Sequence, residues 1–145
     1  MKTKVVQISP VSASEKSNGQ PLYASLPSAG FPSVGDDFVE DSLDITDFLV
    51  DNPSATFFVK VNGDSMEGAK IFNNDILVVN RALQAKPDSI VVAAVNGELV
   101  VKRLKKTATG LVLASENEHY EPILLTESDE CFIWGVVTGS ARKLS

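Results

Sequence analysis

The chain has 145 residues, of which 43% are hydrophobic and 22% charged, and a formal net charge of -6 at pH 7. This length suits one domain with a proper core, and the composition is ordinary for a soluble globular protein. The acidic balance excludes non-specific nucleic-acid binding by the whole surface. One cysteine, Cys131, excludes an internal disulfide framework and fits a reducing compartment. No run approaches the roughly 20 apolar residues of a membrane span, so we expect a soluble, cytoplasmic protein.

The first 35 or so residues differ in composition from the rest of the chain. They carry Asn18-Gly19, a Ser-rich stretch around it, and four prolines: Pro10, Pro21, Pro27 and Pro32. Such a stretch buries little apolar surface, although Leu22-Tyr23 and Phe31 could dock onto something. We therefore predict two parts, a flexible N-terminal arm over residues 1–35 and a core over residues 36–145.

Seven acidic residues lie between Asp36 and Asp51. Asp44 can cap a short helix in which Ile45, Phe48 and Leu49 share one face, and we expect it to stop before Pro53. The acidic run fits either a solvated face or a surface that repels DNA or meets a basic partner.

After this helix the pattern predicts β-structure. The expected strands are short, rich in β-branched residues and separated by turn signals, and two of them are joined by Asn96-Gly97, a strong hairpin signal. We place them at 55–61, 76–79, 89–95, 98–104, 110–114, 122–125 and 131–138. Short strands with almost no helix predict a mostly β fold with a compact, barrel-like core.

Ser65 and Lys102 are the clearest candidates for catalytic residues. A Ser hydroxyl is a poor nucleophile at neutral pH and needs an adjacent group to take its proton. Lys can serve as that group only when it is neutral, which requires desolvation. Because alternate strand residues share a face, Val100 and Leu104 flank Lys102. The residues alone fit a Ser–Lys hydrolase, but they also fit a Ser and a Lys with structural roles.

The turn before Ser65 supports the catalytic interpretation. Gly63 gives the chain the dihedral freedom that a sharp turn needs. Backbone N–H groups around the turn, including that of Ser65, can form an oxyanion hole. We therefore assign turn or oxyanion support to Gly63, Asp64 and Met66.

Several separate motifs resemble the LexA/UmuD family of self-cleaving serine peptidases, over about residues 30–137. Two stretches are similar to the UmuD branch in particular, Ala29–Ser33 and Pro53–Lys60. The motifs shared with the whole family are Gly63-Asp64-Ser65-Met66, Asp75-Ile76-Leu77-Val78-Val79 and Val100-Val101-Lys102-Arg103-Leu104.

The resemblance implies a site and a reaction. Ser65 would be the nucleophile, Lys102 the general base, and Ala29-Gly30 the bond that the chain cleaves in itself. It also implies a homodimer, stimulation of cleavage by a RecA filament on single-stranded DNA, and a UmuC-like translesion DNA polymerase as partner in SOS mutagenesis. The small residues at the bond, with Pro27 and Pro32 beside it, fit an extended substrate segment.

Two departures from the family motifs concern turns. Asn74 stands where the family usually has Gly, and Asn tolerates the left-handed conformation that such a turn needs. Asn80 stands where an Asp is common, and we expect this to affect at most a surface contact.

The sequence also fits other functions. The region before the core has no pattern for a recognition helix, so we expect no sequence-specific DNA binding and favour the UmuD branch over a repressor. The alternatives are a non-catalytic polymerase-binding module, a LexA-like repressor fragment without its DNA-binding domain, and a signal-peptidase-like enzyme, which the missing membrane anchor disfavours.

The remaining polar residues support neither a metal nor a cofactor. His119 is the only histidine, so we predict a surface residue rather than a metal ligand or triad member. Cys131 and Trp134 are interpreted as packing residues. The basic cluster of Arg103, Lys105 and Lys106 fits either a solvated strand end or a contact with a partner's acidic surface.

Overall fold

The computed structural model describes residues 1–11, 42–125 and 131–145. The chain divides into two compact units, one formed by residues 1–11 and 52–145 and the other by residues 12–51. The predicted cleavage site at Ala29-Gly30, together with Leu22-Tyr23 and Phe31, lies outside the described residues.

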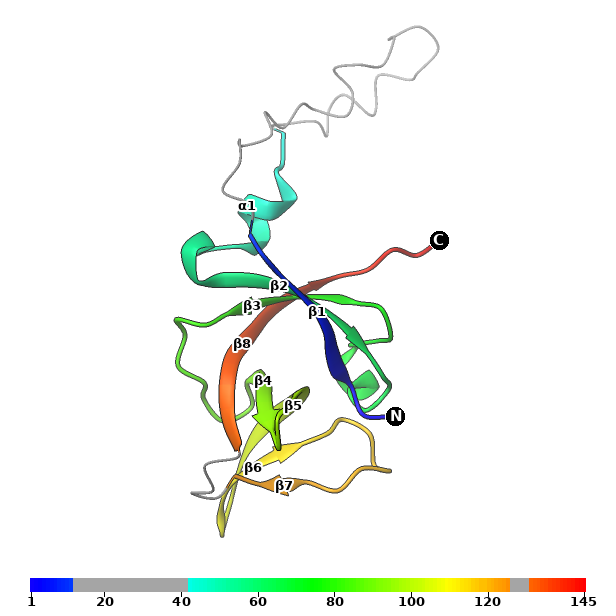
Figure 1. The fold of residues 1–145 in the computed structure, drawn as a ribbon, viewed down its shortest axis with the longest axis vertical. Coiled ribbons are helices and arrows are strands. Elements are labelled where there is room, and N and C mark those ends of the chain that lie inside the picture. Colours follow the sequence, from blue (N-terminus) through cyan, green and yellow to red (C-terminus); the bar gives the residue numbers. More distant parts are fainter. Residues whose placement is uncertain (12–41, 126–130) are drawn as a thin grey trace, which may run out of the picture. The chain divides into compact units, whose positions relative to one another are not determined.

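The larger unit is built on one antiparallel sheet that closes on itself (Figure 1). Its strands follow the order β1-β2-β3-β8-β4-β5-β6-β7, and β1 also pairs with β5. This second pairing closes β1, β2, β3, β8, β4 and β5 into a barrel of six strands. The strands are β1 (Lys4–Pro10), β2 (Thr56–Asn62), β3 (Ile76–Asn80), β4 (Ile90–Val95), β5 (Glu98–Thr107), β6 (Gly110–Ala114), β7 (Ile123–Leu124) and β8 (Cys131–Ala141). The mostly β, barrel-like fold predicted from the sequence is confirmed.

The buried residues of the barrel strands are mainly Val and Leu. One buried cluster contains Val59, Leu77 and Val101, and a second contains Val91 and Leu104. Val101 and Leu104 come from the same strand but belong to different clusters, as expected for strand residues of opposite parity. Lys102 has the same parity as Leu104, so the pleat of β5 places it on the face of the strand that the second cluster covers.

The predicted hairpin joins β4 and β5. Val95 pairs with Glu98, and Asn96 and Gly97 between them have φ angles of 51° and 82°. Both angles lie in the left-handed region that a tight two-residue hairpin turn requires. The register set by this turn pairs Lys102 with Val91, one of the buried residues of the second cluster.

In the smaller unit, the described residues contain the predicted short helix, α1 (Ile45–Leu49). The Asp44 side chain accepts hydrogen bonds from the amides of Thr46 and Asp47, at 2.9 and 3.3 Å. The predicted N-cap is thus confirmed, and the helix ends at Leu49, before Pro53. Two short 3₁₀ helices, η3 (Pro53–Ala55) and η4 (Glu67–Ala69), belong to the larger unit.

The start of the chain differs from the prediction of an arm that begins at residue 1. Lys4–Pro10 forms β1, which pairs with β2 over six residues and contacts β5 at Val100. Composition alone misjudged this segment, because β1 contributes backbone hydrogen bonds that close the barrel and places only Val5 against the core. Residues 12–35, the rest of the predicted arm, lie outside the described residues.

Within the described ranges, no helix is long and apolar enough to cross a membrane.

Candidate active site

Ser65 lies in the turn that follows β2 and precedes η4. Its side chain is fully buried, and its carbonyl accepts a hydrogen bond from the amide of Glu116 at 2.8 Å. Its Oγ accepts a hydrogen bond from the backbone N–H of Thr3 at 2.7 Å. The predicted nucleophile is therefore held at both its backbone and its hydroxyl.

Gly63 is required by the geometry of this turn. Its φ is +120°, and a Cβ atom added there would lie 2.4 Å from the Lys2 carbonyl oxygen and 2.6 Å from the Thr3 Cα. Both the backbone conformation and the close approach of another segment exclude a side chain. The turn support predicted for Gly63 thus has a definite structural basis.

Lys102 occupies the desolvated position that its flanking residues predict. Val100 and Leu104 are each 2% exposed, and Lys102 itself is only 4% exposed. Burial, with a smaller contribution from the charge of Lys2, holds the pKa of Lys102 below its ordinary value. Its Nζ donates a hydrogen bond to the Ser115 Oγ at 2.7 Å and lies 6.0 Å from the centre of the Tyr120 ring.

The dipeptide Ser115-Glu116 connects the two predicted catalytic residues. Ser115 accepts the hydrogen bond from Lys102, and the next amide, that of Glu116, donates to the Ser65 carbonyl. Glu116 is fixed by an ion pair with Arg103, and its carbonyl accepts a hydrogen bond from the Gly68 amide at 2.9 Å. Ser65 and Lys102 are thus linked through one dipeptide, while their side chains have different hydrogen-bond partners.

Asp64 connects the turn to three other residues through hydrogen bonds. Its carboxylate accepts hydrogen bonds from the Met1 amino group and from the Tyr120 hydroxyl, each at 2.8 Å, and these bonds lower the pKa of Asp64. Its carbonyl accepts a longer bond, 3.3 Å, from the Asn117 side chain. Met66, by contrast, is a fully buried core residue. A part for these residues or for the Ser65 amide in an oxyanion hole stays a prediction.

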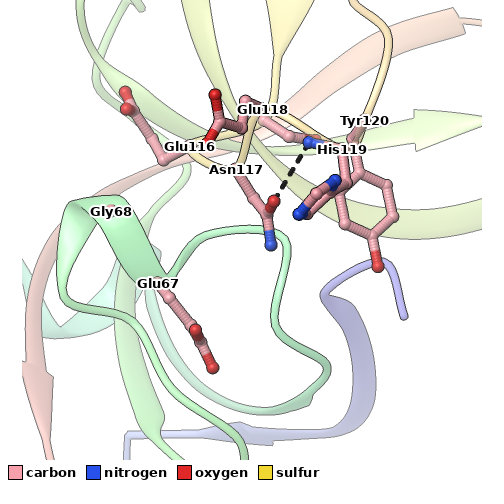
Figure 2. A pocket seen from close by; sticks show the side chains of 8 residues that line it. Glu67, Gly68, Glu116, Asn117, Glu118, His119 and Tyr120 are labelled. Atoms are coloured by element: carbon pink, nitrogen blue, oxygen red, sulfur yellow. Dashed lines mark hydrogen bonds between the residues drawn. The ribbon is translucent and has the colours of Figure 1, made fainter.

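An open pocket of about 720 Å³ borders this site (Figure 2). In the view of Figure 2, Asn117 lies between Glu67 and Tyr120, and its side chain accepts a hydrogen bond from the His119 amide. Ser115 and Tyr120 line the pocket and also contact Lys102 or Asp64. Solvent in the pocket therefore reaches Ser115, which bonds to Lys102, and Tyr120, which bonds to Asp64. Its lining residues are Glu67, Gly68, Ser115, Glu116, Asn117, Glu118, His119 and Tyr120.

The two Asn departures have different outcomes. Asn74 has a φ of 72°, so it adopts the predicted left-handed conformation. Asn80 is buried, and its side chain accepts a hydrogen bond from the Ala82 amide at 2.8 Å. The expectation of a mere surface contact at Asn80 was wrong, because the residue caps the turn that ends β3.

The other polar and aromatic residues have structural contacts. Arg103 and Lys105 form ion pairs with Glu116 and Asp88. Trp134 packs against the first cluster, and the Arg81 guanidinium carbon lies over its ring, 4.4 Å from the ring centre. Cys131 packs against the second cluster, and burial raises the pKa of its thiol. Among the described residues, no group of three or more His, Cys, Asp and Glu could hold a metal ion.

Sequence reasoning missed Thr3, Ser115 and Tyr120 as members of the site. Ser115 follows directly on the apolar strand 110–114, and a polar residue at the end of such a strand is the signal that could have drawn attention to it. Thr3 and Tyr120 are separated from Ser65 by 62 and 55 positions, and no local pattern indicates their contacts.

The sequence of the chain matches the model of a known family over most of its length. The model of the Peptidase S24-like family matches residues 21–138. The chain therefore belongs to the LexA/UmuD family of S24-like serine peptidases, enzymes of the self-cleaving kind.

Its relatives lie at moderate sequence distance. The chain is 36% identical to Protein MucA of Salmonella typhimurium over 135 residues, which cover 93% of this chain and 92% of that protein. It is 37% identical to Protein ImpA of Shigella flexneri over 82% of this chain and 81% of that protein. It is 35% identical to a LexA repressor of Shewanella sediminis, which it matches over 95% of this chain and 66% of that protein.

Proposed function

We propose that this chain is a UmuD-like SOS mutagenesis protein that cleaves itself between Ala29 and Gly30. Ser65 is the nucleophile and Lys102 is the general base. Cleavage releases residues 30–145 as the active subunit of an error-prone translesion DNA polymerase. Membership in the LexA/UmuD family and the relatives MucA and ImpA support the general role.

The reaction needs no group beyond the chain itself and water. Neutral Lys102 takes the proton of Ser65 as Oγ attacks the Ala29 carbonyl carbon, which gives a tetrahedral oxyanion. The bond between Ala29 carbon and Gly30 nitrogen then breaks, and Lys102 returns the proton to the Gly30 amine. Water, deprotonated by Lys102, hydrolyses the remaining ester between Ala29 and Ser65.

The observation that carries the proposal is the environment of Lys102. A Lys that is 4% exposed, flanked by two aliphatic residues on its own face and linked through Ser115-Glu116 to Ser65, has no evident structural purpose. Burial of an unpaired ammonium is costly, so such a residue is expected to be neutral and available as a base.

The partners in this proposal follow from the family. A homodimer in the cytoplasm would meet a RecA filament on single-stranded DNA, which favours the docked conformation of the cleavage segment without adding a catalytic group. The processed chain would then bind a UmuC-like polymerase. The net charge of -6 agrees with a protein that does not itself bind DNA.

One observation favours a second candidate, a polymerase-binding module without peptidase activity. Ser65 is fully buried, and its Oγ is already hydrogen-bonded to Thr3. A nucleophile in this state is not free to react, as expected for a chain that binds a polymerase without cleaving itself.

The deciding experiment is intact mass spectrometry of the purified protein after incubation at neutral and alkaline pH, with and without RecA, single-stranded DNA and nucleotide. We expect one cut, between Ala29 and Gly30, in the wild type and none in Ser65→Ala or Lys102→Ala. Lys105→Ala serves as the matched control, because Lys105 is on the same strand but half exposed. Absence of a cut in all proteins, with the filament present, would favour the binding module.

A further inference from the structure

The first three residues of the chain lie on the predicted nucleophile. The amide of Thr3 donates to Ser65 Oγ at 2.7 Å, and the Thr3 carbonyl accepts from the Val101 amide at 3.0 Å. The Met1 carbonyl accepts from the Asp64 amide at 2.9 Å. Backbone groups of this segment thus bind the Ser65 turn on one side and β5 on the other, and Thr3 is fully buried there.

These contacts are of the kind that a peptide substrate makes. An extended peptide can pair with the edge of a strand through main-chain hydrogen bonds, and this pairing does not depend on the side chains of the peptide. The turn leaves room for such a backbone because residue 63 is Gly, whose added Cβ would collide with the Lys2 carbonyl and the Thr3 Cα. The surface is therefore shaped for an extended peptide rather than for these three residues in particular.

The segment and the scissile bond cannot occupy this surface together. A carbonyl carbon must come within about 3–3.5 Å of Ser65 Oγ before attack. The Thr3 nitrogen already lies 2.7 Å from that oxygen, and its N–H donates a hydrogen bond to a lone pair of the oxygen. The hydroxyl is thus both covered and made less nucleophilic.

The segment is also attached in a way that permits release. β1 pairs with β2 over six residues but with β5 only at Lys4 and Val100, and Met1–Thr3 extend beyond the end of the β1–β2 ladder. Among the described residues, the buried Thr3 hydroxyl has no hydrogen-bond partner, which weakens the bound state. Residues 1–3 can therefore leave while β1 keeps its pairing with β2.

Resting on the proposed function, we propose that the Gly63–Ser65 turn and the adjoining part of β5 form an extended-peptide site that residues 1–3 occupy in the uncut chain. The cleavage segment competes with residues 1–3 for this site, and self-cleavage requires their release. A stimulating partner would then act partly by shifting this competition.

The test measures access to position 65 without depending on catalysis. Ser65→Cys in a Cys131→Ser background carries one thiol, whose alkylation by iodoacetamide is followed by intact mass. Thr3→Pro removes the N–H that contacts position 65, and Ser9→Pro is the matched control, because it introduces proline at the other end of β1, opposite Phe58. We expect alkylation to be at least about tenfold faster with Thr3→Pro than with Ser9→Pro. In the Thr3→Pro variant the thiol at position 65 is permanently exposed, whereas in the control it is exposed only when residues 1–3 open locally.

The second arm introduces the same proline variants into a chain with intact Ser65 and measures self-cleavage. Faster cleavage with Thr3→Pro, together with faster alkylation, supports the competition. Equal alkylation of the two variants overturns it, even if the protein cleaves itself. Faster alkylation of Thr3→Pro without cleavage in any variant would support a peptide site that residues 1–3 occupy. It would refute the proposed peptidase function and the competition that depends on it.

Discussion

Lys102 is the residue whose environment most directly suggests its chemistry. It is buried between aliphatic neighbours, and its pKa is held below the ordinary value chiefly by desolvation. The neutral form therefore predominates at a lower pH than for a solvated Lys, whose pKa is about 10.4. This is the property that a base for a Ser hydroxyl needs.

The first prediction concerns the pH dependence of self-cleavage. In the proposed mechanism deprotonation of Lys102 produces the active base, so the first-order rate should rise with pH through the lowered pKa and level off below about pH 10.4. The rate is measured by intact mass at a series of pH values. A rate that does not change between neutral and alkaline pH would exclude Lys102 as the base. Lys102→Arg, which stays charged, should not cleave at any pH in the series.

The second prediction concerns Ser115, which we regard as a positioning residue. Ser115→Ala removes the only hydrogen bond described for Lys102 Nζ and should lower the plateau rate about 10- to 100-fold through loss of orientation. It should also move the midpoint of the pH profile downward, because the hydroxyl oxygen accepts a bond that favours the charged form. Ser115→Thr should restore both. An unchanged plateau and midpoint in Ser115→Ala would show that the bond has no catalytic role.

At the scale of elements, two turns hold the site in place. The Asn96-Gly97 turn fixes the register of β5 and hence the pairing of Lys102 with the buried Val91. The turn at Gly63 connects β2 to Ser65 and lies against the backbone of residues 1–3. Both glycines have positive φ angles, but only Gly63 lies against another segment of backbone.

The third prediction compares these two glycines. Gly97→Ala introduces only backbone strain, since nothing lies within 4 Å of an added Cβ, and should cost about 1 kcal/mol of unfolding free energy. Gly63→Ala adds a collision with the Lys2 backbone and should cost clearly more, about 2–3 kcal/mol. Urea denaturation followed by tryptophan fluorescence measures both, on a Ser65→Ala background that cannot cleave. Equal costs would mean that residues 1–3 move away without loss of stability.

At the scale of the whole molecule, β1 is the strand that closes the barrel. It pairs with β2 along its length and reaches β5 at Lys4, so the ring depends on residues that precede the proposed cleavage site. Cleavage between Ala29 and Gly30 would separate β1 covalently from the rest of the barrel. The processed chain would then have open edges on β2 and at the start of β5, and open edges are sites where other strands pair.

The fourth prediction follows from this closure. Backbone amides of β2 should exchange with solvent faster in the polypeptide 30–145 than in the full-length Ser65→Ala chain, because β1 no longer pairs with them. Hydrogen exchange with mass spectrometry resolves the peptides. The β3–β8 ladder, in which neither strand is paired with β1, is the internal control. Equal protection of β2 in the two polypeptides would mean that something else covers its edge after cleavage.

The sequence by itself determined most of the local structure. Hydrophobic alternation and β-branched residues placed seven strands, Asn96-Gly97 defined the hairpin, and Asp44 defined the start of the helix, because these features depend on neighbours in the chain. The same local logic located Lys102 between aliphatic residues, and the resemblance to the family, which usually has Gly at position 74, predicted a left-handed Asn74. It also supplied the motifs around Ser65 that indicate the family.

Only the tertiary structure decided how distant segments complete the site. The strand over residues 4–10, the cover of Thr3 on Ser65 and the bond from Lys102 to Ser115 join positions far apart in sequence. Such contacts are fixed by barrel closure and by the satisfaction of buried backbone groups, which no short window of residues contains. The burial of Asn80 was misjudged for the same reason, since its exposure depends on β8 and the following turn rather than on its own polarity.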